Sequence, residues 1–338
     1  QSRHSFSGRM AEALKKPDTK SCFSKFLLLL RKQTSFYIMH TQDVKTNSIQ
    51  AWWLASRPKT LSGALVPVVV AAALAWKDER FSTDLTLLCM LFAILMQIAA
   101  NFINDLFDFK RGSDRTDRLG PERACAQGWI TPHAMQRGII VTLLAACATG
   151  LLLLGLSHAG AELLFVGAAC VIFAFLYTTL LSYCGLGDVL VWLFFGFVPV
   201  LGTYFVQAHH LTAESWIAAT GCGLAIDNLL IVNNYRDRQA DRLSGKRTLV
   251  VVLGERFGSY FYLIQGALAY VCCAALGLMS SQMRWCMILP LAYLAWHTMA
   301  WRRMVKINNG RKLNKILGQT SKNILLFGIM LALSILLG

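Results

Sequence analysis

Long apolar runs recur from about residue 60 to the end of the chain and limit the folds open to it. A helix needs about 20 apolar residues to cross a bilayer, and these runs hold roughly 17–25. Only 15% of the 338 residues are charged, against about 25% in a typical soluble domain. The sequence therefore predicts an all-α, polytopic membrane protein with nine transmembrane helices. The expected spans are residues 60–76, 83–103, 138–157, 160–181, 188–206, 213–232, 258–278, 283–301 and 320–338.

The chain is strongly basic, with 33 Lys and Arg against 18 Asp and Glu. Such an excess can indicate nucleic-acid binding, so the positions of the charges decide its meaning. The loops 104–137, 233–257 and 302–322 hold 19 of the basic residues, whereas the loops on the other side hold 3. The positive-inside rule makes the first set cytoplasmic, together with the N-terminus. We expect a multi-pass protein of the cell membrane with its C-terminus outside and no nucleic-acid partner.

The first 50 residues differ from the rest because they are polar and basic and contain no run long enough to span a bilayer. They are interpreted as a disordered or weakly membrane-associated extension, followed by a membrane domain over residues 51–338. Two acid-rich loops inside that domain resemble each other, and Asp105 and Asp237 are 132 positions apart. This spacing predicts an internal duplication, with helices 1–4 and 5–8 as the halves and helix 9 added.

Polar side chains cluster at the cytoplasmic ends of the second and sixth spans. Helical spacing would align each set along one face. The first set is Gln97, Asn101, Asn104, Asp105 and Asp108, and the second is Asn233, Asn234, Asp237 and Asp241; the bases that follow include Arg115, Arg118, Lys246 and Arg247.

Carboxylates at the mouths of two helices repel one another unless a cation lies between them. An acid in the middle of a membrane costs about 2.5–3.5 kcal/mol on insertion scales, so it normally faces a cavity or a partner. Oxygen ligands suit Mg²⁺, which completes its coordination with waters and substrate phosphates, and nearby Lys and Arg can bind the remaining phosphate oxygens. Surface ion pairs at a solvated helix end could explain one segment. Two matching segments on one face favour a site for Mg²⁺ and a diphosphate.

At these residues the chain resembles the UbiA superfamily of membrane prenyltransferases. The similar stretches run from residue 51 to about 338. They are SRPKTL (56–61), NFINDLFDFKRGSDRTDRLGP (101–121), QGWITP (127–132), GLGD (185–188), FFG (194–196) and NNYRDRQADRLSGKRTLVVVLGE (233–255).

The resemblance implies a Mg²⁺-dependent enzyme that transfers a polyprenyl chain from an allylic diphosphate to an aromatic acid. The naphthoate branch fits best, with 1,4-dihydroxy-2-naphthoate as acceptor, loss of CO₂ and a demethylmenaquinone product for menaquinone biosynthesis. Transfer to 4-hydroxybenzoate or another aromatic acid is the alternative.

Carried over by position, the resemblance also implies roles for individual residues. The stretch 179–184 departs from the family pattern, and Asp227, in the middle of a span, receives no role. The implied metal ligands are Asn104, Asp105, Asp108, Asp237 and Asp241. Asn101 would bind substrate, and Arg115, Arg118, Lys246 and Arg247 would lie near the phosphates. Arg57 and Lys59 would lie on the acceptor's side, and Tyr177 would lie near the reacting carbon.

Other classes of membrane protein share parts of this pattern. GLGD at 185–188 matches the GxGD motif of intramembrane aspartyl proteases, but the Tyr-Asp and Pro-Ala-Leu strings that those enzymes need do not occur. CDP-alcohol phosphotransferases need an Asp-Gly dipeptide, which is also missing from the sequence. A transporter would show broken helices around a midplane site, whereas these acids lie at one membrane face.

Overall fold

The computed structural model describes residues 44–112, 118–179, 181 and 184–338, so residues 1–43 of the N-terminal extension lie outside the described part. Residues 46–338 form one compact helical unit, and no strand occurs among the described residues. The long helices are α4 (Leu61–Lys77), α5 (Thr83–Lys110), α6 (Pro132–Ser157), α7 (Glu162–Thr179), α9 (Val198–Ala208), α10 (Ala213–Leu243), α11 (Leu249–Met279), α12 (Leu291–Ile307) and α13 (Leu313–Leu336); shorter ones are α3 (Ile49–Ala55), η3 (Pro58–Thr60), α8 (Gly187–Val191), η5 (Trp192–Phe197) and η6 (Ser281–Met287).

Seven helical segments in the described ranges are long and apolar enough to cross a bilayer. Their positions agree with seven of the predicted spans. The other two predicted spans, 160–181 and 283–301, fall at the shorter helices α7 and α12. The all-α membrane fold is confirmed, and the count of nine crossings stays a prediction. The seven segments are Ile49–Lys77, Thr83–Lys110, Pro132–Ser157, Gly187–Ala208, Ala213–Leu243, Leu249–Met279 and Leu313–Leu336.

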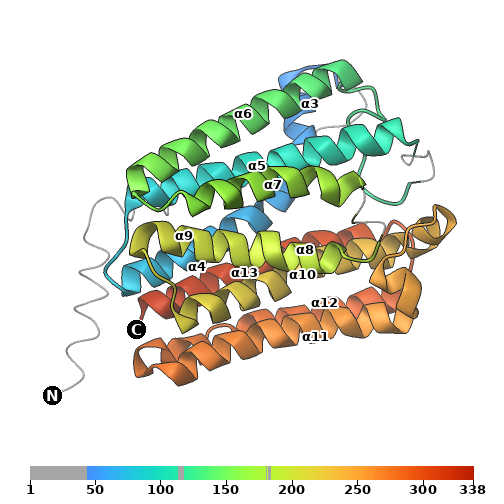
Figure 1. Ribbon diagram of the computed structural model, residues 1–338. Coiled ribbons are helices and arrows are strands. Elements are labelled where there is room, and N and C mark those ends of the chain that lie inside the picture. Colours follow the sequence, from blue (N-terminus) through green and yellow to red (C-terminus); the bar gives the residue numbers. More distant parts are fainter. Residues whose placement is uncertain (1–43, 113–117, 180, 182–183) are drawn as a thin grey trace. The chain divides into compact units, whose positions relative to one another are not determined.

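Helix α10 is the central element of the bundle. It packs against α11, α13, α9, α4 and η5. Within its apolar stretch 72% of the residues are buried in the protein, against 17% for α6. In Figure 1, α5, α6 and α7 lie together on one side, α11 and α12 on the other, and α4, α9, α10 and α13 between them. The second aspartate segment is thus at the end of the best-supported helix.

The contact between η5 and α10 depends on two glycines. A Cβ on Gly196 would lie 2.7 Å from the carbonyl oxygen of Ala219 and 2.8 Å from Cα of Gly223. Both atoms belong to backbone and cannot rotate away. The π-helical turn of η5 therefore packs backbone against backbone, and π-helical turns are frequent at functional sites.

The helices that carry the two aspartate segments extend beyond the predicted spans. Helix α5 continues to Lys110 and α10 to Leu243, where the spans were expected to end at 103 and 232. The added turns are polar, which hid them from a criterion based on apolar length. They place the acids on rigid helix rather than on loops.

Candidate functional site

The fold brings the ends of α5 and α10 together. Asn314, at the start of α13, accepts a hydrogen bond from Arg236 and donates one to the Leu119 carbonyl, both 2.8 Å long. A Cβ on Gly120 would lie 2.9 Å from Nη2 of Arg236 and 3.3 Å from Nε of Arg118. The loop after the first aspartate segment thus packs directly on the second segment.

Asp105 organises the loop that follows α5. Its Oδ2 accepts a 2.8 Å hydrogen bond from the backbone N–H of Ala124, and its Oδ1 accepts a 2.9 Å bond from that of Cys125. The residue is only 1% exposed. Both carboxylate oxygens are therefore engaged inside the protein, a geometry that suits a positioning residue.

Asp108, one helical turn later, has a different environment. Its Oδ2 accepts a 2.7 Å charge-assisted hydrogen bond from Nη2 of Arg123, and its side chain is 19% exposed. Charge-assisted bonds of this length are among the stronger ones in proteins. Asp108 is therefore an accessible carboxylate held in place by a buried arginine.

The acids of the second segment are also accessible. Asp237 pairs with Arg236 through two bonds of 2.8 and 2.6 Å, and its side chain is 26% exposed. Asp241 lies 4.0 Å from Nζ of Lys246 (measured to Oδ1) and is 13% exposed. Each of these carboxylates lies beside a basic side chain and keeps a surface from which a ligand could be bound.

The end of α7 closes another side of this region. Asn104 Oδ1 accepts a 2.7 Å hydrogen bond from the Thr178 hydroxyl, and Arg111 donates a 3.0 Å bond to the Thr178 carbonyl. Tyr177 is half-buried beside them. The charged groups that act on its hydroxyl are Asp188, Asp227, Asp108 and Arg123.

The segment before α4 contributes an arginine. Asn101 donates hydrogen bonds to the Ser56 carbonyl (2.9 Å) and to Thr60 Oγ1 (3.2 Å), which fixes the turn around Arg57. Arg57 adopts the left-handed conformation (φ 51°, ψ 67°), and its Nη2 is buried without a hydrogen-bond partner among the described residues. Its charged neighbours are Arg123, Asp105, Arg118 and Asp108. An unsatisfied guanidinium N–H beside the aspartates points to an anionic ligand.

The other predicted bases have different positions. Lys59 is exposed on the side of α13, where its carbonyl accepts a 2.7 Å hydrogen bond from Ser321. Arg247 is exposed in the loop after α10, and its carbonyl oxygen would lie 2.9 Å from a Cβ on Gly185. Arg115 and residues 180, 182 and 183 of the stretch 179–184 lie outside the described residues.

Several residues of this region were not predicted from the sequence. Arg123 and Arg236 support the accessible acids, and Asn314 joins them from the last helix. Asp188 and Asp227 are buried close enough to interact electrostatically, and Gln265 donates a 2.9 Å bond to Asp227. The position of Arg236 directly before Asp237 could have indicated its role, whereas no sequence pattern near Asn314 indicated that it belongs to this region.

The oxygen donors fit a divalent cation that arrives with its substrate. In the described part of the chain, no three His, Cys, Asp or Glu side chains lie close enough to hold a metal unaided. Mg²⁺ commonly uses only one or two carboxylates and takes its other ligands from phosphates and water. The carboxylates of Asp108, Asp237 and Asp241 suit this mode, because each keeps part of its surface exposed for a metal ion to bind.

Comparison with known proteins gives consistent matches over most of the chain. The sequence profile of the UbiA prenyltransferase family matches residues 64–333. The chain is 39% identical to a 1,4-dihydroxy-2-naphthoate octaprenyltransferase of Escherichia coli over 72% of this chain and 81% of that protein. It is 32% identical to the Haemophilus influenzae protein of the same name over 89% of this chain and 100% of that one.

Solved structures share the arrangement of helices. A UbiA homologue from Archaeoglobus fulgidus, determined with GPP and Mg²⁺, superposes with a TM-score of 0.61 at 15% identity, covering 85% of this chain and 99% of that one. At this identity the likeness concerns the fold.

Proposed function

The chain belongs to the UbiA prenyltransferase family, and we propose that it transfers a polyprenyl chain from an allylic diphosphate to 1,4-dihydroxy-2-naphthoate. Diphosphate and CO₂ would leave, and a demethylmenaquinone would form. The observation that carries the proposal is the meeting of two aspartate segments and their bases at one end of a membrane bundle. The relatives named for this reaction support the choice of acceptor.

We assign the metal to the accessible oxygen donors. Asn104, Asp108, Asp237 and Asp241 would hold Mg²⁺, and Asp105 would position the loop that carries Arg123. When bound, Mg²⁺ neutralises the negative charge that develops on the departing diphosphate. Asn101 acts through the Arg57 turn.

The bases of the site would bind the anionic parts of both substrates. Arg118 and Lys246 lie beside the acids and are placed to bind phosphate oxygens, with Arg247 and Arg115 in the adjoining loops. The unpartnered N–H of Arg57 is assigned to the acceptor's carboxylate. Lys59 lies farther toward α13, so we assign it to attracting the aromatic acid as it approaches the site.

The prenyl chain needs an apolar surrounding once the C–O bond breaks. The face of Tyr177 can stabilise an allylic cation through its π electrons. A Cβ on Gly187 would lie 3.8 Å from this ring and 3.2 Å from Cδ2 of Leu230, so the space beside Tyr177 is bounded by these two residues. Exclusion of water by the helix bundle protects the cation until the naphthoate ring carbon attacks it.

A product analysis tests the acceptor. Purified protein receives one polyprenyl diphosphate with either 1,4-dihydroxy-2-naphthoate or 4-hydroxybenzoate, with Mg²⁺ or EDTA. We expect a prenylated naphthoquinol lighter by CO₂, formed only with Mg²⁺. A prenylated 4-hydroxybenzoate that retains its carboxyl group would select the alternative, and absence of product with either acid would contradict the proposal.

The protein is an integral membrane protein with many apolar helices. We propose that its N-terminal side and the aspartate segments face the cytoplasm, because the basic loops adjoin those segments. The aromatic acid is water-soluble and would enter from that side, whereas the prenyl diphosphate would arrive within the bilayer.

A further inference from the structure

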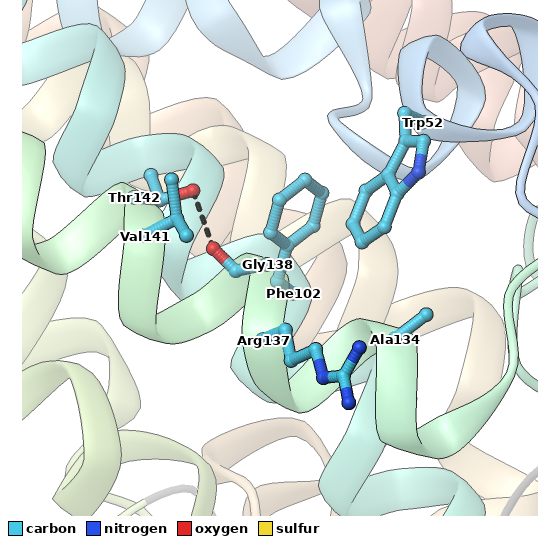
Figure 2. Close-up of a pocket in the computed structure, with 7 residues that line it drawn as sticks. All are labelled: Trp52, Phe102, Ala134, Arg137, Gly138, Val141 and Thr142. Carbon is cyan, nitrogen blue, oxygen red and sulfur yellow. Dashed lines mark hydrogen bonds between the residues drawn. The ribbon is translucent and has the colours of Figure 1, made fainter.

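A groove on the lipid-facing side of the bundle has none of the acids of the aspartate segments in its lining, although Phe102 belongs to the first segment. Its volume is about 430 Å³, and it is lined by Trp52, Phe102, Ala134, Arg137, Gly138, Val141 and Thr142. These residues come from α3, α5 and α6. Figure 2 shows the rings of Trp52 and Phe102 beside the first turns of α6, with Arg137 near one end of the group.

The floor of the groove is aromatic and fixed. Trp52 and Phe102 pack edge to face with ring centroids 5.3 Å apart. Gly138 makes room for the indole, because a Cβ there would lie 2.5 Å from the Trp52 ring. The Thr142 hydroxyl donates to the Gly138 carbonyl at 2.7 Å and therefore offers no donor to a ligand. Arg137 is the charged residue of the lining.

The groove opens where lipid is the solvent. Val141 is 66% exposed, and its neighbours Ile140 and Leu144 are 58% and 64% exposed. Arg137 is exposed, and no ion pair or hydrogen bond involving it is found among the described residues. It lies five residues after the first residue of α6, about 7.5 Å along the helix. It directly precedes the expected span 138–157 and therefore lies at the edge of the apolar part of α6.

We propose that this groove binds one anionic phospholipid, with its phosphate on Arg137 and an acyl chain over Trp52, Phe102 and Val141. An apolar trough with a single cation at its headgroup end complements a lipid whose only net charge is a phosphate. Basic pockets between transmembrane helices are known to select anionic headgroups. A zwitterionic lipid would bring its own cation next to Arg137 and bind less tightly.

The groove is connected to the aspartate region through hydrogen bonds. The backbone N–H of Asn47, just before α3, donates 2.7 Å to the Trp129 carbonyl, and Asn47 Oδ1 accepts from the Thr131 N–H at 3.2 Å. The same turn, residues 124–131, supplies the N–H groups that bind Asp105. A lipid held against Trp52 would therefore brace the turn that positions this acid.

Lipid binding to the intact protein in an uncharged detergent tests the proposal without any prenyl transfer. Dioleoylphosphatidylglycerol and dioleoylphosphatidylcholine are titrated, with native mass spectrometry and Tm as readouts. We expect one phosphatidylglycerol per chain, bound about tenfold more tightly than phosphatidylcholine, because both lipids offer a phosphate to Arg137 but only phosphatidylcholine brings an ammonium group that repels it. Arg137→Gln should remove the preference, and Val141→Trp should weaken both lipids.

Exposed positions elsewhere provide matched controls. Arg302→Gln on α12 and Val271→Trp on α11 change the same residue types at exposed sites and should leave both affinities unchanged. Equal phosphatidylglycerol binding in the parent, Arg137→Gln and Val141→Trp would overturn the proposal. It would also fail if glycerol phosphate alone, or a prenyl diphosphate, displaced the phosphatidylglycerol, because the site would then serve a free phosphate or the substrate.

Discussion

Asp105 and Asp108 lie one helical turn apart on α5, yet their side chains have different tasks. Asp105 accepts two backbone hydrogen bonds and is almost fully buried, whereas Asp108 is paired with one arginine and partly exposed. Spacing alone made them equivalent. Their partners, Ala124, Cys125 and Arg123, belong to a loop whose path no local pattern indicates.

Replacing Asp105 should mainly reduce stability. In Asp105→Asn the amide offers one acceptor oxygen to two N–H groups, and its own NH₂ faces the other donor. An unsatisfied buried donor costs about 1–3 kcal/mol, so we expect a lower Tm by thermal unfolding in detergent. Activity should fall in parallel. An unchanged Tm would show that the loop does not depend on this acid.

Asp241→Asn should separate catalysis from stability. Its 4.0 Å contact with the half-exposed Lys246 is a weak ion pair, so Tm should stay near that of the parent. Loss of a carboxylate that holds the metal should lower kcat/KM about 100-fold and raise the Mg²⁺ concentration needed for half-maximal activity. Glu122→Gln, at an exposed position of the loop between α5 and α6, is the control. A normal Mg²⁺ response in Asp241→Asn would argue against the metal assignment.

Arg57→Met should raise the KM for the aromatic acid about tenfold while leaving the KM for the diphosphate near normal. The guanidinium is buried with an unpartnered N–H, so removing it also removes an unsatisfied group, and Tm should stay equal or rise. Steady-state kinetics with each substrate varied in turn gives the answer. If neither KM changed, Arg57 would not contact a substrate.

Helix ends and close contacts explain most of the differences between prediction and structure. The apolar runs located the helices, because bilayer thickness sets their length. The apolar runs did not show where α11 begins. The helix starts at Leu249, well before the expected start at 258, because Thr248 caps it and accepts a 3.3 Å hydrogen bond from the Val251 N–H. Gly254 (φ 91°) interrupts it one turn later, a conformation that glycine adopts without strain. Helical spacing located the acids and the family resemblance suggested their roles, whereas the pairing of Arg123 with Asp108 depends on the path of the loop after α5.

The contact between η5 and α10 should be sensitive to a single methyl group. In Gly196→Ala the new Cβ would approach backbone atoms of Ala219 and Gly223 at 2.7 and 2.8 Å. Overpacking of this kind typically costs about 1–3 kcal/mol. We expect a lower Tm, and activity should fall because η5 follows the GLGD turn. Gly202→Ala on α9, which has open space around it, should be neutral or slightly stabilising. Equal behaviour of the two variants would contradict this explanation.

At the scale of the whole molecule, the distribution of charge predicts the orientation in the membrane. Alkaline phosphatase fused after Gly338 should be active, because it is exported, whereas a fusion after Gly310, between α12 and α13, should be inactive. Green fluorescent protein at the same two positions should show the opposite pattern. The reverse result would place the basic loops outside and contradict the positive-inside interpretation.

The hydrogen bonds of Asn314 set the moment at which this region can assemble. Ribosomes deliver the chain from its N-terminus, so α5 and α10 enter the membrane before α13 is made. Arg236 and the Leu119 carbonyl then lack the side chain that joins them. In a nascent chain the two aspartate segments would not yet be joined by the hydrogen bonds of Asn314, and the site would be complete only when the final helix has been inserted.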